Sequence, residues 1–283
     1  MGSVVMIGLA VLGVCLGSFV NALVWRLHEL EKLGESMALG ATERRQKLSI
    51  SRGRSMCPHC GQVLGAKDLV PIVSWVFLRG KCRYCHAPID DTPIPELLGG
   101  VLFVLSYIFW PFPFTVLGVA LLAVWLGCLV CMLALAVYDA RWYILPTKLI
   151  IVLSCLAGLF AVLRIAAGGV NVAAIATVSG AVLLLWGLFR LIYAISPKLI
   201  GFGDVRLAVP LALLAGSPLM VLVLLFVASF VGTLLALPLL VSGRKTLKQA
   251  LPFGPFLLLG CVVAVLFGSD MLRWLDTTLF YVG

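Results

Sequence analysis

Two groups of residues in this chain have the types and the spacing that chemistry needs. The first is a pair of aspartates, Asp139 and Asp204, the only acidic residues between Glu96 and Asp270. An ionised carboxylate is costly next to hydrocarbon, so acids in such a sequence usually have a functional role. The second group is four cysteines in a polar stretch: Cys57, Cys60, Cys82 and Cys85.

The aspartate pair suits hydrolysis of an amide bond. Two carboxyl groups held close together cannot both ionise cheaply, so one keeps a proton while the other acts as a base. One carboxylate can then activate a water molecule while its protonated partner polarises a carbonyl group. All three histidines (His28, His59, His86) lie in the polar stretch, so a nucleophilic triad in the apolar part is not expected. The glycines in Gly201-Phe-Gly-Asp204 predict unusual dihedral angles or close backbone approach beside the second aspartate.

The four cysteines match the C-x₂-C…C-x₂-C pattern of a tetrahedral zinc site. Four thiolates fill the coordination sphere, so we expect a structural Zn²⁺ whose binding supplies folding energy to a small polar loop. His59 and His86 lie beside ligand positions as possible substitutes. Disulfide pairing is the alternative, and it is disfavoured in a reducing cytoplasmic loop.

The elements that must position these residues are membrane helices. The chain has 283 residues, of which 62% are hydrophobic and 12% are charged. We predict an all-α polytopic membrane protein with eight spans, the first of which is a permanent helix rather than a cleaved signal. The apolar segments fall near residues 3–25, 97–110, 114–137, 149–163, 170–194, 207–217, 218–241 and 254–268. Three parts follow: a first helix (1–25), a cytoplasmic zinc loop (26–96) and a membrane core (97–283).

Basic residues predict the orientation in the membrane. The net charge is +9, but no nucleic-acid-binding motif is present, and the Lys and Arg residues concentrate in the polar loop. Placing that loop in the cytoplasm leaves only Arg164 and Arg273 on the outer side. The short cytoplasmic connections then carry Arg141, Lys148, Arg190, Lys198, Arg206, Arg244, Lys245 and Lys248. Asp139 and Asp204 both fall on the cytoplasmic face, as a catalytic pair requires.

Two alternatives to a catalytic pair remain open. In the first, each aspartate merely caps a helix at the membrane interface and pairs with Arg141 or Arg206. A proton-coupled transporter also uses acids within the membrane, although no inverted repeat relates the two aspartate segments. Neither alternative requires the four-cysteine loop. The remaining cysteines (Cys15, Cys128, Cys131, Cys155 and Cys261) are expected to be small buried side chains.

Several ordered motifs give the chain a resemblance to a known family. It resembles the type IV prepilin peptidases, the bifunctional leader peptidases and N-methyltransferases of bacterial pilus and type II secretion systems. The likeness covers nearly the whole chain. It rests on Gly17-Ser-Phe-Val-Asn-Ala-Leu-Val-Trp-Arg26, Ser55–Cys60, Val70–Trp75, Leu78–Cys85, Pro95–Leu98, Asp139 with Ile144-Leu-Pro146, Gly201–Leu207 and Pro252–Phe256.

The resemblance implies an inner-membrane aspartic peptidase in which Asp139 and Asp204 are catalytic. The implied substrates are prepilins or pseudopilins, whose short basic leader is removed at the cytoplasmic face. The new N-terminal residue is then methylated from S-adenosylmethionine, with the four-cysteine loop linked more to methylation than to cleavage. No glycine-rich nucleotide fingerprint marks a site for the methyl donor.

The chain departs from the family pattern at three places. Thr147 stands where an acidic residue often follows Leu-Pro, and Leu69 follows Asp68 where asparagine is common. Arg206 replaces the usual lysine after the second aspartate. None of these changes removes a catalytic group.

Overall fold

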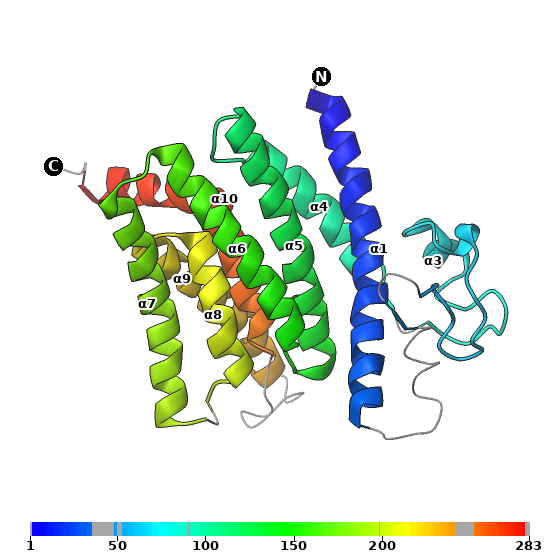
Figure 1. Ribbon diagram of the computed structural model, residues 1–283. Helices are drawn as coiled ribbons and strands as arrows, with labels where there is room; N and C mark the ends of the chain where they lie inside the picture. The colour runs from blue at the N-terminus through cyan, green and yellow to red at the C-terminus, as the bar shows by residue number, and fades with distance from the viewer. Residues whose placement is uncertain are drawn as a thin grey trace. The chain divides into compact units, whose positions relative to one another are not determined.

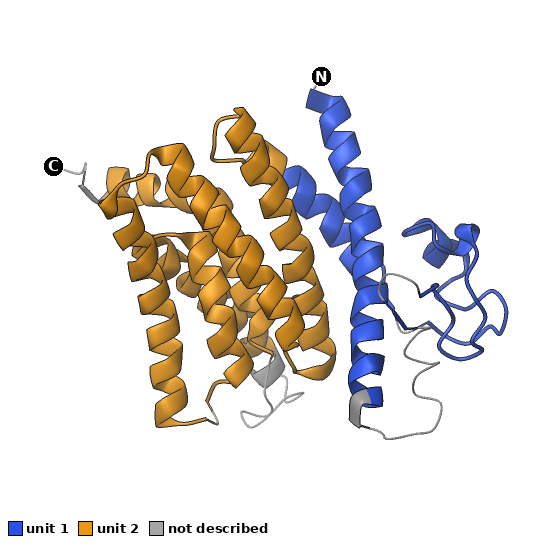
Figure 2. Ribbon diagram, in the orientation of Figure 1, with its two compact units in different colours: residues 1–105 blue, residues 106–283 orange. Residues whose placement is uncertain are grey.

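The chain is almost entirely helical. The computed structural model describes residues 2–35, 48–49, 53–89, 91–197, 199–241 and 252–280. These residues form two compact units, residues 1–105 and residues 106–283 (Figure 2). The basic residues Lys198, Arg244, Lys245 and Lys248, used above to predict orientation, lie outside the described residues.

The first unit holds one long helix and a loop with little regular structure (Figure 1). Helix α1 spans Gly2–Glu35, so it continues past the predicted boundary at residue 25. The reason lies in Leu27–Lys32, a run of good helix formers with no glycine or proline before Gly34. The loop contributes a 3₁₀ turn, η1 (Ala66–Asp68), and a short helix, α3 (Val73–Phe77), and α4 (Ile94–Ile108) follows.

Small residues allow α1 and α4 to pack closely. A Cβ atom added at Gly13 or Gly17 would collide with the backbone of α4 at Gly99 or Pro95. Such contacts between small residues let helix backbones approach in a membrane, where no hydrophobic effect drives helices together. One face of α1 is therefore fixed against α4.

The second unit is a bundle of six helices after the end of α4. They are α5 (Val116–Trp142), α6 (Thr147–Gly168), α7 (Val172–Ile195), α8 (Phe202–Ala215), α9 (Pro218–Val241) and α10 (Gly254–Phe280). Each of the eight predicted apolar segments thus corresponds to a helix. By length and composition, six helices in the described residues can cross a membrane: α1, α5, α6, α7, α9 and α10.

Two of the predicted spans are shorter than a bilayer. Helix α4 has 15 residues and α8 has 14, so each is about 22 Å long against a hydrocarbon core of about 30 Å. The polytopic membrane fold therefore holds, with six helices of full spanning length among the described residues.

Helix α8 lies at the centre of the second unit, in contact with α6, α7, α9 and α10 (Figure 1). Eight of its 14 residues are buried. At its C-terminal end, Nη1 of Arg164 donates hydrogen bonds to the carbonyl oxygens of Leu214 (3.1 Å) and Ala215 (3.2 Å). A cation at this position satisfies the last carbonyls and complements the helix dipole. These contacts fix the axis on which Asp204 lies.

The cysteines outside the polar loop do not all behave as predicted. Cys128 and Cys261 are buried and Cys131 is half-buried, as expected for packing residues. Cys15 and Cys155 are exposed, so the prediction of buried side chains is wrong for these two. Both lie on apolar helices, where hydropathy alone does not distinguish an exposed residue from a core residue, and Cys15 lines a cavity in the first unit.

Candidate active site and metal centre

Asp139 lies in the last turn of α5, where the chain reverses toward α6. Tyr143 ends the helix in the left-handed conformation (φ 57°), and its N–H donates to the carbonyl oxygen of Asp139 at 2.8 Å. Pro146 then precedes α6 as its N-cap residue. The Asp139 side chain is buried, and its Oδ2 atom has no hydrogen-bond partner in the described part of the chain. The backbone of Gly254 also acts on this carboxyl group as a hydrogen-bond donor, so the turn holds Asp139 against the start of α10.

Asp204 lies within α8 rather than on a flexible turn before it. Gly201 is the N-cap residue, so Asp204 is the third residue of the helix, and its N–H donates to the Gly201 carbonyl at 3.1 Å. Gly201 has φ −71°, and neither Gly201 nor Gly203 has a positive φ, so the prediction of unusual dihedral angles is wrong. The prediction of close approach is confirmed, because a Cβ on Gly203 would be 3.0 Å from Cβ of Leu145.

The sequence analysis assigned no role to Gly254, yet this residue borders the pair. A Cβ atom added there would be 2.5 Å from Oδ2 of Asp139, so the carboxyl group rests against the first residue of α10. Helix α10 also packs against α5 and α8, and the charge of Asp139 acts on Asp204. Asp204 lies in the first turn of α8, and Asp139, in the last turn of α5, lies against the first residue of α10. Each carboxyl group is therefore near a helix N-terminus, where partial positive charge stabilises an anion. Asp204 is half-buried, so the site is more open on its side.

The arginine near the pair has a different partner from the one considered above. Nη1 of Arg206 donates to Oγ1 of Thr147 at 2.8 Å, and its guanidinium lies over the Phe202 ring at 4.4 Å. Neither aspartate forms a salt bridge with any described residue. Two of the three departures from the family pattern, Thr147 and Arg206, therefore contact each other and join the start of α6 to the start of α8.

The four cysteines of the polar loop come together, as their spacing predicts. Cys57, Cys60, Cys82 and Cys85 place their sulfur atoms within 4.8 Å of one another. The two C-x-x-C turns have the same backbone pattern: Gly61 N–H donates to the Cys57 carbonyl at 2.9 Å, and His86 N–H donates to the Cys82 carbonyl at 3.0 Å. Both Gly61 (φ 70°) and His86 (φ 57°) adopt the left-handed conformation.

This cluster fits a tetrahedral metal ion. Four sulfur atoms about 2.3 Å from a central Zn²⁺ lie about 3.8 Å apart, and the Cys57 and Cys85 sulfurs are 3.8 Å apart. Hydrogen bonds from the backbone of Cys85 and Tyr84 lower the pKa of the Cys82 thiol to about 7, while desolvation and the neighbouring sulfurs raise the pKa of the Cys85 thiol to about 12. Without a cation, the four clustered thiols therefore cannot all ionise, and a metal ion would supply the positive charge that four thiolates need. All nine cysteines are free, and neither His59 nor His86 belongs to the cluster.

Two family models match this chain, one over the segment with the four cysteines and the other over the segment with the two aspartates. Residues 11–110, which include the cysteine cluster, match the bacterial peptidase A24 N-terminal domain. Residues 126–237, which include both aspartates, match the type IV leader peptidase family. Similar proteins extend the likeness over most of the chain. One from Burkholderia pseudomallei is 34% identical over 274 residues, covering 92% of this chain and 84% of the relative. This chain belongs to the type IV leader peptidase family.

That Burkholderia relative is named prepilin leader peptidase/N-methyltransferase. A second leader peptidase/N-methyltransferase, from Legionella pneumophila, is 30% identical over 267 residues, covering 91% of this chain and 90% of the relative. A third, from Escherichia coli, is named type 4 prepilin-like proteins leader peptide-processing enzyme and is 32% identical over 268 residues, covering 89% of this chain and 90% of the relative. No solved structure matches the chain.

Two residues near the candidate site received no role in the sequence analysis, although Gly254 belongs to the Pro252–Phe256 motif of the resemblance. Gly254 lies outside both matched segments, and its signal was a glycine between Phe253 and Pro255 at the start of an apolar run. Arg164 was counted only as an outside charge, although it holds the end of α8. Both act through contacts with residues far away in the sequence.

Proposed function

We propose that this protein is an inner-membrane aspartic endopeptidase that removes the leader from prepilins or pseudopilins and then N-methylates the new N-terminal residue. The observation that supports cleavage most directly is the buried carboxyl of Asp139, which rests against the first residue of α10, a helix that packs on the Asp204 helix α8. The relatives' names supply the substrate and the second activity. None of those names is a transporter, so the transporter alternative has no support.

In the proposed mechanism the two carboxyl groups share one proton and titrate as a unit. Water reaches them from the side of half-buried Asp204. The ionised carboxyl takes a proton from this water as the water oxygen bonds to the scissile carbonyl carbon, and the protonated carboxyl gives its proton to the carbonyl oxygen. The carboxyl that is now protonated then gives its proton to the leaving nitrogen as the C–N bond breaks. The other carboxylate takes back a proton as the carbonyl group re-forms, so the pair again holds one proton. The N-termini of α8 and α10 stabilise negative charge at the pair throughout.

The proposed orientation places the pair at the cytoplasmic face. Asp139 and Asp204 are on one side of the membrane if both α6 and α7 cross it, and both helices are long and apolar enough to do so. This requirement is independent of the short helices α4 and α8. The polar loop carries eleven of the 21 basic residues, counted from Arg26 to Arg83 along the sequence, which supports its cytoplasmic placement.

Within the same proposal, Cys57, Cys60, Cys82 and Cys85 hold a structural Zn²⁺ that is saturated by four thiolates. The three parts of the chain then have separate tasks: the first helix (1–25) anchors the loop, the zinc loop (26–96) supports methylation, and the membrane core (97–283) cleaves. S-adenosylmethionine, when bound, supplies a methyl carbon that leaves its sulfonium sulfur for the N-terminal nitrogen, which loses a proton.

The test uses the purified full-length protein and a synthetic prepilin segment that carries its leader. Wild-type protein should make one cut after the leader, with a bell-shaped dependence on pH because one carboxyl must be ionised and one protonated. Asp139→Asn and Asp204→Asn should each reduce cleavage by at least about 10³-fold.

Asp270→Asn is the matched control, because it makes the same substitution at an exposed acid of α10 that pairs with Arg273. It should leave cleavage unchanged. Substantial cleavage by a correctly inserted Asp139→Asn or Asp204→Asn variant would refute the aspartate mechanism.

A further inference from the structure

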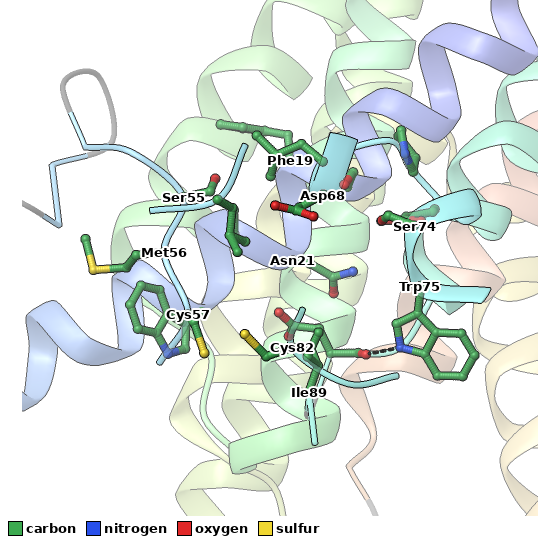
Figure 3. Close-up of a pocket in the computed structure, with 18 of the residues that line it drawn as sticks. Phe19, Asn21, Ser55, Met56, Cys57, Asp68, Ser74, Trp75, Cys82 and Ile89 are labelled. Carbon is green, nitrogen blue, oxygen red and sulfur yellow. Dashed lines mark hydrogen bonds between the residues drawn. The ribbon is translucent and has the colours of Figure 1, made fainter. Parts of the chain in front are cut away.

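The first unit contains a cavity that the peptidase mechanism does not use. Its volume is about 410 Å³, which is within the range of small-molecule binding sites. It lies between α1 and the four-cysteine loop (Figure 3). Its walls include Ser18, Asn21 and Trp25 of α1 and Trp75 and Cys82 of the loop.

The walls of this cavity are held by contacts on both sides. The cavity-facing residues of α1 follow helical spacing, at Ser18, Ala22 and Trp25, while Gly13 and Gly17 fix another face of the helix against α4. On the loop side, Nε1 of Trp75 donates to the Asp91 carbonyl at 2.9 Å, as Figure 3 shows. The Glu96 carboxylate accepts the N–H of Ile72. Hydrogen bonds and helix packing within the first unit therefore fix the walls of the cavity.

Asn21 places a buried hydrogen-bond acceptor, its Oδ1 atom, at the wall of the cavity. Its Nδ2 atom donates to the Thr92 carbonyl at 3.1 Å, which fixes the orientation of the carboxamide. Its Oδ1 atom is buried and has no hydrogen-bond partner within the described residues. The side chain as a whole is 6% exposed. An unpaired buried acceptor is costly, so this position favours a ligand that brings an N–H or O–H donor.

The remaining lining favours an aromatic, positively charged ligand. Phe19, Trp25 and Trp75 provide three aromatic side chains, which can stack on a flat heterocycle and attract an organic cation. Ionisable side chains also line the cavity, and its three acids outnumber its two arginines: Asp68, Asp91, Glu96, Arg26 and Arg83. Nε of Arg83 lies 2.6 Å from Oδ1 of Asp68 and holds the pKa of that carboxyl below its usual range, so Asp68 stays ionised.

We propose that this cavity is the binding site for S-adenosylmethionine. The ligand combines the properties that the lining selects: a flat adenine ring, several N–H and O–H donors, and a sulfonium and an ammonium group that give it a net positive charge. Asn21 accepts a hydrogen bond from the ligand, the aromatic side chains bind adenine and the sulfonium, and the acidic residues attract the cationic end. This proposal rests on the methyltransferase half of the proposed function.

The position of the cavity also connects the metal cluster to methylation. Cys57 and Cys82, the two buried cysteines of the cluster, are themselves lining residues. A metal bound by the cluster would therefore shape one wall of the donor site. The metal needs no part in the transfer reaction to affect it.

The test is calorimetric titration of S-adenosylmethionine into the purified, metal-loaded full-length protein. Wild-type protein should bind one equivalent. Asn21→Ala should weaken binding by at least about tenfold, because the acceptor is lost from a buried position. Ala22→Phe should abolish binding by filling the cavity from α1 while leaving every polar group in place.

Gln62→Ala is the matched control, since it removes a carboxamide from an exposed residue of the same loop that does not line the cavity. It should bind the ligand as the wild type does. Metal content is measured for each variant, because retained metal shows that the loop is still folded. If Ala22→Phe loses its metal, the proposal is tested by the affinity of Asn21→Ala.

Wild-type affinity in a metal-loaded Ala22→Phe or Asn21→Ala protein would overturn the proposal. So would a phospholipid that occupies the cavity of the purified protein in a one-to-one ratio and is not displaced by S-adenosylmethionine. A failure of the peptidase proposal can be distinguished from a failure of this one, because it would be seen as leader cleavage by the Asp139→Asn variant. That variant should bind S-adenosylmethionine normally.

Discussion

The two regions that carry chemistry are stabilised in opposite ways. In the described loop residues 53–89, only Cys57 and Cys82 are buried, and neither η1 nor α3 has a buried residue. In α8, which carries Asp204, eight residues of 14 are buried. A loop with so small a core is expected to depend on the proposed metal for folding, whereas the aspartates are held by helix packing. We therefore expect that either region can be disrupted while the other remains folded.

The largest expected effect is the loss of metal from the loop. Cys82→Ser removes one of four ligands, and structural zinc sites contribute about 10–16 kcal/mol of apparent binding free energy at neutral pH. The variant should lose its metal and become sensitive to protease within residues 53–89, while the helices of the second unit stay protected. Metal analysis and limited proteolysis measure both effects.

Cys155→Ser is the matched control for this loss, because Cys155 is an exposed cysteine of α6 outside the cluster. It should keep its full metal content. A metal-free wild-type protein with a protease-resistant loop would contradict this account of the loop.

The second prediction disrupts the aspartate region alone. Gly254→Ala places a methyl group 2.5 Å from the present position of Oδ2 of Asp139, so the carboxyl group or the start of α10 must move. A misplacement of this size costs about 10²-fold in activity. Leader cleavage should fall by that factor, with metal content unchanged.

Gly127→Ala provides the control for that result. It adds the same methyl group on α5 at an ordinary contact distance, 3.6 Å from Cδ1 of Leu156. Cleavage by this variant should stay near the wild-type rate. Equal losses in the two variants would show that general helix packing, rather than the position of Asp139, explains the effect.

The third prediction concerns the contact between Thr147 and Arg206. Thr147→Val and Arg206→Met each remove the 2.8 Å hydrogen bond and should lower cleavage by about fivefold, since an exposed hydrogen bond contributes about 1 kcal/mol. The double variant should lose little more than either single variant. Fully additive losses in this double-mutant cycle would show that the two residues act independently.

An effect no larger than this is expected at the cysteine turns, where only backbone strain changes. Gly61 has φ 70° with nothing within 4 Å of an added Cβ, so Gly61→Ala should weaken metal binding by about 1 kcal/mol through backbone strain alone. His86 occupies the same position in the second turn at φ 57°, so His86→Gly should strengthen binding slightly. Competition with a chelator measures both, and a weaker His86→Gly site would show that the imidazole has a role of its own.

Much of the fold was predictable because a membrane helix is marked by a continuous run of apolar residues in the sequence. Every predicted apolar segment is a helix, since about 20 apolar residues have few other structures available in a bilayer. The ends of the helices were less predictable. Helix α1 continues to Glu35 because good helix-forming residues follow the end of its apolar stretch. The number of full-length spans also differed, because α8 is covered by other helices instead of being long enough to cross alone.

The sequence by itself determined the membrane character of this protein and the four cysteines that come together in its loop. Charges and chain direction also predict that Asp139 and Asp204 share one membrane face. Only the tertiary structure placed Gly254 against Asp139, joined Arg206 to Thr147, and enclosed a cavity around Asn21. The physical reason is that hydropathy and motif spacing depend on neighbouring residues. A contact between helices depends on which faces meet, which the packing of the whole chain decides.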